Sequence, residues 1–232
     1  MRSPLPWLLL AMSLPALAAD PSGQALNTEG FRLYQAGKYP EALEKFTAAA
    51  EADPKLALAH YNIAATLGVL RKQGRKCEYD AFLETMLERL QKAVELDPRR
   101  LTRAQKDADL TPLHTTVGWQ RLLGRQPEND ADLPEILRHV TWASDPGGMM
   151  STRHTLSFPS PGRAVLETSA FNEKTDRFVR SKKTGTYTLE GRTLRLSFPQ
   201  QKPLEGRVAP GGGLEFGEPL GTLVDTPSEC DA

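Results

Sequence analysis

The sequence has little of what marks several large classes of protein. Lysine and arginine total 29 and aspartate and glutamate total 29, so the 232-residue chain has no excess of either charge. Such a chain has no overall positive charge to attract nucleic acids or an anionic membrane. After the N-terminus, no apolar run approaches the ~20 residues that a membrane-spanning helix needs. We therefore expect no nucleic-acid partner and no transmembrane segment.

Motifs of catalytic and metal sites are also missing. The sequence has no Gly-x-Ser-x-Gly elbow, no His-Glu-x-x-His pair, no Cys-x-x-Cys and no phosphate-binding glycine-rich loop. Its four histidines lie far apart and lack the spacing of metal ligands. We therefore expect no enzyme activity, no catalytic residues, no metal and no cofactor.

Cysteine is scarce, with only Cys77 and Cys230, one in each half of the chain. In an oxidising compartment an even number of cysteines favours a disulfide. A bond closing a loop of about 150 residues contributes roughly 5 kcal/mol in the chain-entropy model. The alternative is two separate thiols, because a sequence gives no distance between them.

The N-terminal stretch MRSPLPWLLLAMSLPALAAD has the layout of a cleaved secretory signal. Arg2 supplies the early positive charge, an apolar run follows from Leu5 to Leu17, and small residues end the stretch. We expect cleavage after Ala18, with Ala19 as the alternative. No cysteine follows the cut, so no lipid anchor is expected. The mature protein should be exported to the periplasm or out of the cell.

The stretch FRLYQAGKYPEALEKFTAAAEADP has apolar and small residues at helical spacing. It predicts two short helices, Ala25 to Ala36 and Pro40 to Ala52, folded back as a hairpin. Gly37 ends the first helix, and Pro54 prevents the second from continuing.

The landmarks of this hairpin resemble those of the 34-residue tetratricopeptide repeat (TPR). They are Gly30, Gly37, Tyr39, Ala42, Phe46, Ala49 and Pro54, whereas Leu26 and Glu29 stand where the family commonly has Trp and Leu. The resemblance implies helices stacked into a right-handed superhelix whose concave face binds peptides or protein segments, without catalytic chemistry.

A second unit follows, with about ten inserted residues. It predicts longer helices, Leu56 to Lys72 and Tyr79 to Leu96, around a turn containing RKQGRKC. A third motif, Asp107 to Gly124, resembles the shortened helical ending of exported TPR proteins. It should cap the stack by packing four side chains against the preceding helices: Leu110, Leu113, Trp119 and Leu122.

The resemblance implies a groove lined by the first helix of each unit. The candidate partner-binding residues are Asn27, Phe31, Tyr34, Tyr61 and Asn62. Asn62 matches the position from which the family bonds a peptide backbone. A carboxylate clamp is not expected, since Asn27 and Phe31 replace its Lys and Asn. Alternatively, the aromatic side chains pack between helices.

A run of four cations, Arg71, Lys72, Arg75 and Lys76, lies at the turn of the second unit. It could meet an acidic partner or a phosphate. The alternative is a solvated loop tip beside Glu78 and Asp80.

After the polar joint GRQPENDADLPE the chain changes to short alternating strands. The hairpin TYTLEGRTLRLSF has a predicted two-residue turn at Glu190-Gly191. Further strands are expected at Ala164 to Ala170, Leu204 to Val208 and Leu214 to Phe216. Six or seven strands predict an antiparallel meander that forms a small barrel or a sandwich.

This half resembles lipocalin-like meanders in the order of Trp142, a strand ending in Phe158, a turn at Gly162, and GTYTLEGRTLRL. No ligand-binding residues carry over. The expected interior consists of Trp142, Leu156, Phe158, Leu166, Tyr187 and Leu194. The alternative is a ligand cavity.

This half also contains a run of four cations, Arg177, Arg180, Lys182 and Lys183. They form either a basic patch for cell-wall polymer or acidic protein, or charges that protect a sheet edge.

The sequence thus predicts an α+β protein of two domains. The expected divisions are a signal peptide at 1–18, a TPR-like helical domain with its cap at 22–124, a linker at 125–134 and a small all-β domain at 135–232. The leading hypothesis is a non-catalytic protein-binding adaptor or scaffold. The alternatives are a lipocalin-like carrier of a small apolar ligand and, third, an unrecognised enzyme of the cell envelope.

Overall fold

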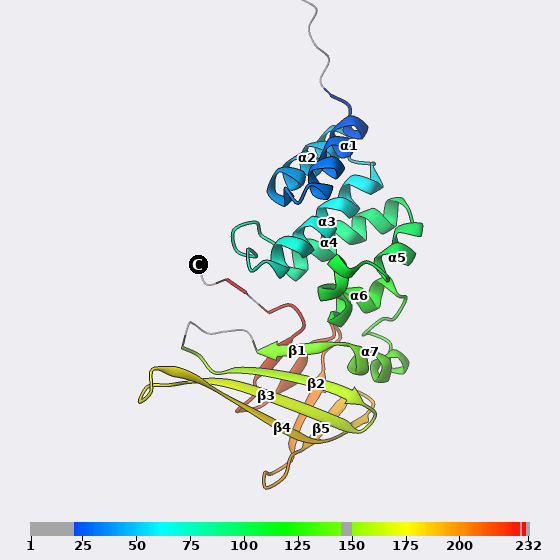
Figure 1. The fold of residues 1–232 in the computed structure, drawn as a ribbon. Helices are drawn as coiled ribbons and strands as arrows, with labels where there is room; N and C mark the ends of the chain where they lie inside the picture. Colours follow the sequence, from blue (N-terminus) through cyan, green and yellow to red (C-terminus); the bar gives the residue numbers. More distant parts are fainter. Residues whose placement is uncertain (1–20, 145–149, 228, 231–232) are drawn as a thin grey trace, which may run out of the picture.

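The computed structural model describes residues 21–144, 150–227 and 229–230, which form a helical part followed by a closed β-barrel (Figure 1). The predicted α+β class with two domains is confirmed. The expected signal peptide lies outside the described residues. None of the helices in the described segments is long and apolar enough to cross a bilayer. The helical elements are α1 Gly23–Gln35, α2 Tyr39–Ala52, α3 Ala57–Lys72, α4 Leu83–Leu96, α5 Arg99–Ala104, η1 Ala108–Thr115, α6 Val117–Leu122, η2 Asp130–Asp132 and α7 Leu133–His139.

The first hairpin, α1 and α2, forms for the local reasons that the sequence gives. The Ser22 side chain caps α1 by accepting the Ala25 N–H. Gly37 follows the helix with φ +74°, a conformation that glycine adopts without steric cost. Gly30 lets the two helices approach closely, because a Cβ there would lie 2.8 Å from the Phe46 ring.

The second hairpin, α3 and α4, differs from the prediction where its helices begin. Helix α3 begins at Ala57, one residue later than the predicted Leu56. Helix α4 begins at Leu83, four residues later than the predicted Tyr79. Side-chain interactions organise the preceding segment as a loop. The Arg75 guanidinium lies 4.6 Å from the centroid of the Tyr79 ring and also hydrogen bonds to Glu78.

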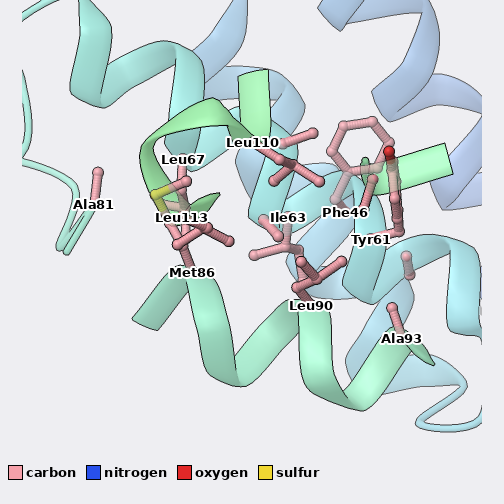
Figure 2. Close-up of a cluster of buried hydrophobic side chains, with 14 of the residues drawn as sticks. Phe46, Tyr61, Ile63, Leu67, Ala81, Met86, Leu90, Ala93, Leu110 and Leu113 are labelled. Atoms are coloured by element: carbon pink, nitrogen blue, oxygen red, sulfur yellow. The ribbon is translucent and has the colours of Figure 1, made fainter. Parts of the chain in front are cut away.

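The predicted cap on the helical stack is confirmed. Leu110 and Leu113 of η1 are fully buried, and Trp119 of α6 is 4% exposed. Figure 2 draws the two leucines in the same buried cluster as Leu67 and Met86. Leu122 is partly buried against this cluster.

The second half closes as an antiparallel barrel in which each strand pairs with the next and β1 pairs with β8. The strands are β1 Thr141–Ser144, β2 Arg153–Ser160, β3 Arg163–Asn172, β4 Arg177–Glu190, β5 Thr193–Ser197, β6 Leu204–Val208, β7 Leu214–Phe216 and β8 Thr222–Val224. Of the two predicted alternatives, the barrel is therefore the observed one. Five of the six side chains expected inside are buried, and Tyr187 is partly buried against them.

The turn between β4 and β5 lies one residue later than predicted. Glu190 pairs with Thr193, so the two-residue turn is Gly191-Arg192 and not Glu190-Gly191. Gly191, with φ +57°, takes the first of the two turn positions, where a hairpin turn favours glycine with positive φ, so Glu190 stays in the strand.

The segment between the two parts packs against the barrel. Residues 125–134, expected as a linker, contain η2 and the start of α7. Leu133, Ile136 and Leu137 belong to the same buried cluster as the barrel interior, and so does Val117 of α6. The helical part therefore contributes directly to the packing at the end of the barrel.

The C-terminal segment returns to the helical part, where it lies beside the α3–α4 loop (Figure 1). Cys77 and Cys230 form a disulfide, with their Cα atoms 5.9 Å apart. Beside the bond, both oxygens of the Glu229 carboxylate accept hydrogen bonds from Arg71. The Lys76 amine lies 3.4 Å from the same carboxylate. Two of the four cations in this basic run, Arg71 and Lys76, therefore pair with Glu229 near the end of the chain. The other two pair elsewhere, Arg75 with Glu78 and Lys72 with Asp109.

Candidate functional site

The five candidate partner-binding residues lie on α1 and α3, the two helices expected to line the groove. Four of them surround one small cavity of about 40 Å³: Phe31, Tyr34, Tyr61 and Asn62. Phe46, Ala65, Arg103 and Asp107 complete its lining. The fifth, Asn27, touches this group through Asn62.

Asn27 and Asn62 join the two helices. The Asn62 amide donates a hydrogen bond to Asn27 Oδ1 at 3.0 Å, and Asn27 is only 3% exposed. Asn62 was expected to bond the backbone of a bound peptide. Here at least one of its two amide hydrogens is used inside the protein, where it satisfies a buried oxygen.

The two tyrosines bond to carboxylates of the cap. Tyr61 Oη donates to Asp107 at 2.7 Å, and Tyr34 Oη donates to Asp109. The Arg103 guanidinium also lies 5.5 Å from the centroid of the Tyr61 ring. The segment from α5 to η1 therefore covers the part of the groove that the tyrosines line.

Close backbone packing fixes this cover in place. A Cβ at Gly68 of α3 would lie 1.9 Å from the carbonyl oxygen of Asp109, so only glycine fits there. Lys72 adds an ion pair to the Asp109 carboxylate at 3.3 Å and donates to the carbonyl of Ala108. The cap is thus bound to α3 by packing, charge and hydrogen bonds together.

Burial and the neighbouring carboxylates change the acidity of both tyrosines. Burial, followed by the hydrogen bond to Asp109, raises the pKa of Tyr34 far above its usual value. Burial and the bond to Asp107 likewise raise the pKa of Tyr61, although Arg103 lowers it in part. Both hydroxyls therefore remain protonated and act as hydrogen-bond donors at any physiological pH.

Asp107 and Asp109 were not predicted to contact the residues of the groove. A local signal for Asp107 is present, because it precedes the apolar cap as a capping residue would. In the structure its side chain accepts the Asp109 N–H at 3.0 Å. No local signal could have paired either carboxylate with a tyrosine 46 or 75 residues away in sequence.

Phe31 differs from the other four candidates because it is exposed. Its side chain is 44% accessible, whereas Asn27 and Tyr61 are buried and Tyr34 and Asn62 are partly buried. Because it lines the cavity and is also exposed, it lies at the rim of the cavity. An exposed aromatic side chain beside a groove is the kind of residue that anchors a protein partner.

The fold defines a short helical repeat module joined to a β-barrel. A family model described as a TPR repeat matches residues 30–68, which run from α1 through most of α3. The matched segment includes Phe31, Tyr34, Tyr61 and Asn62. No curated protein matches the chain. The chain is therefore a protein with a TPR repeat, and its barrel is consistent with the lipocalin-like resemblance.

The barrel is compatible with the carrier hypothesis, but its interior is occupied by side chains. Trp142, Leu156 and Leu194 are fully buried and belong to one continuous apolar cluster. The Trp142 indole N–H donates to the carbonyl of Gly212 at 2.9 Å. In the described segments, no three His, Cys, Asp or Glu side chains come together to hold a metal ion.

Proposed function

We propose that this protein is a non-catalytic adaptor or scaffold that binds a protein or peptide segment through its TPR module after export. A single observation carries the proposal. The matched TPR repeat presents an exposed aromatic side chain, Phe31, at the rim of the groove. Modules built from such repeats bind partners on the surfaces that their stacked helices create.

Export is proposed on two grounds. The first 18 residues have the layout of a secretory signal. The disulfide between Cys77 and Cys230 supports the same location, because such bonds persist in oxidising compartments and are rare in the cytosol.

The partner should bind at the rim of the groove, because displacing the cap would cost free energy. Leu110 and Leu113, which belong to the cap, are fully buried. Exposing one such leucine costs about 1.5–3 kcal/mol. A partner that displaced η1 would also have to break the two tyrosine–carboxylate bonds. Binding at Phe31 and the adjoining surface of α1 requires neither change.

Site-specific photo-crosslinking in the producing cell tests where a partner binds. A photoreactive residue would replace Phe31 in one variant and Glu88, an exposed residue of α4, in a matched control. We expect a covalent adduct with a defined protein from position 31 and none from position 88. Equal labelling of the same protein from both positions would contradict binding at the rim.

Affinity measurement with the purified partner then tests the role of Phe31. We expect Phe31→Ala to weaken binding by at least tenfold, as for aromatic anchors at other interfaces. The control is Met150→Ala, which removes another exposed apolar side chain (64% accessible) outside the helical part. Unchanged affinity in Phe31→Ala, with the fold intact by circular dichroism, would refute this assignment.

A further inference from the structure

We infer that an edge of the barrel binds an acidic polypeptide segment as an added β-strand. The edge is formed by residues 177–184 of β4, here called the arm edge. β3 and β4 remain paired as far as Asn172 and Arg177, whereas β5 pairs with β4 only from Thr186 onward. In the described part of the chain, the arm edge therefore pairs with β3 alone. Figure 1 shows this hairpin projecting beyond the other strands.

The backbone of the arm edge is suited to strand addition. Tyr187 donates its N–H to Gly162, on the β3 side. The register between β3 and β4 runs without interruption, so the backbone groups of alternate residues point to opposite sides. Four residues thus direct their N–H and C=O groups toward the open side, where an added strand can pair with them: Phe178, Arg180, Lys182 and Thr184.

The arm edge lacks most of the features that normally protect a sheet edge. It is long and regular, and all eight of its residues are exposed. Phe178 and Val179 are 48% and 51% accessible. Edge strands are usually short, bulged or covered, because exposed apolar edges pair with other chains. The remaining protection is positive charge.

This charge determines which strand can bind. The arm edge carries Arg177, Arg180, Lys182 and Lys183, and of these only Lys182 has an acidic partner among the described residues, Glu167 at 2.7 Å. A second copy would place cations against cations, and like charges on neighbouring strands are destabilising. A strand with carboxylates would instead form favourable pairs at the same positions.

The adjoining face of the sheet has the same charge. A hollow of about 530 Å³ on β2, β3 and β4 is lined by three cations, Arg153, Arg180 and Lys182, and by one carboxylate, Glu167. Beyond it, Phe171 and Phe178 pack with their ring centroids 5.4 Å apart. Because Phe178, Arg180 and Lys182 share this face, every second side chain of an added strand faces them, and carboxylates at those positions lie against the cations.

Fluorescence anisotropy with the mature, oxidised protein tests the inference. The probe is a labelled peptide of about ten residues in which glutamate and valine alternate. We expect saturable binding. The double variant Arg180→Gln with Lys182→Gln should weaken this binding by about tenfold, because each substitution removes one cross-strand charge pair. The matched control, Arg195→Gln with Arg207→Gln, removes two exposed cations of β5 and β6 and should leave binding unchanged.

Two further peptides separate strand addition from simple charge attraction. N-methylation at alternate residues keeps the charges but removes backbone donors, so it should abolish binding. A peptide with lysine in place of glutamate should not bind. The inference is overturned if the methylated peptide binds as tightly as the unmethylated one, or if the lysine peptide binds. It is also overturned if the control variant loses as much affinity as Arg180→Gln with Lys182→Gln, or if the glutamate peptide shows no saturable binding. Phe31→Ala should not affect this binding, so the result is independent of the proposed TPR function.

Discussion

At the scale of single residues, the helical groove is held closed by hydrogen bonds between tyrosines and carboxylates. Tyr61 and Asp107 meet at 2.7 Å across 46 positions of sequence. A hydrogen bond to a charged group contributes about 1.5–3 kcal/mol. Such a pair can hold the cap in place without any partner, and its contribution can be measured separately.

We predict that Tyr61→Phe and Asp107→Asn are coupled. In a double-mutant cycle, the two changes should show an interaction energy of about 1 kcal/mol in the free energy of unfolding. Tyr61→Phe removes the donor, whereas Asp107→Asn replaces the charged acceptor with a neutral one and so weakens the bond. Urea denaturation of the wild type and the three variants measures it. The control is a second double-mutant cycle, in which Tyr61→Phe is combined with Asp130→Asn. Asp130 lies at the far end of the helical part. Strict additivity of Tyr61→Phe and Asp107→Asn would contradict the closed groove.

At the scale of elements, helix α6 begins with a hydrogen bond from the barrel half. The N–H of Val117, the first residue of α6, donates to Asp225 Oδ2 at 2.7 Å. Burial raises the pKa of Asp225, although backbone N–H groups lower it in part. The fold therefore disfavours the charged form of the Asp225 carboxylate, even though the hydrogen bond from Val117 is itself stabilising.

We predict that Asp225→Asn stabilises the protein at pH 7. The folded pKa is above the unfolded pKa of about 3.9, so this group's stabilising effect is present below that value and is lost as the pH rises through the folded pKa. An amide oxygen can accept the same N–H without charge. We expect a gain of roughly 0.5–1 kcal/mol at pH 7 and almost none at pH 3, measured by thermal unfolding. A loss of stability at both pH values would contradict this.

Elements with a strong local signal could be predicted from the sequence. Apolar spacing, Gly37 and Pro40 were sufficient for α1 and α2, and alternation was sufficient for the β4–β5 hairpin. Boundaries set by longer contacts were less accurate. Helix α4 starts late because Asp80 has a left-handed backbone with φ +49°, and apolar periodicity contains no information about such a conformation.

The candidate site could be predicted only in part. Helical spacing placed the groove residues on α1 and α3, and four of them line one cavity. The cover over the groove depends on Asp107 and Asp109, whose partners lie far away in sequence. The projecting hairpin of β3 and β4 could not be predicted either. Strand alternation gives the faces of these two strands but not where the strands beside them, β2 and β5, stop pairing.

At the scale of the whole molecule, the disulfide ties the last residues of the barrel half to the helical part. Cys77 and Cys230 are 153 positions apart in the sequence. A loop of this length contributes about 5 kcal/mol in the chain-entropy model, and measured values are commonly 2–5 kcal/mol. The ion pair of Arg71 with Glu229 lies beside the bond and reinforces the same connection.

We predict that Cys77→Ser combined with Cys230→Ser lowers the melting temperature by roughly 5–15 °C. A loss of 2–5 kcal/mol corresponds to this range for a protein of this size. Differential scanning calorimetry measures it. Reductant should lower the wild-type value to that of the variant and leave the variant unchanged. If the double variant has the same melting temperature as the oxidised wild type, the disulfide does not stabilise the fold.

Hydrogen exchange of the oxidised protein, with and without the partner identified by crosslinking, tests whether the TPR module binds that partner. We expect the partner to protect amides of α1 and the adjoining surface of α3, while the η1 cap keeps the same exchange rate. Protection confined to the barrel, or faster exchange across η1 as the cap is displaced, would contradict it.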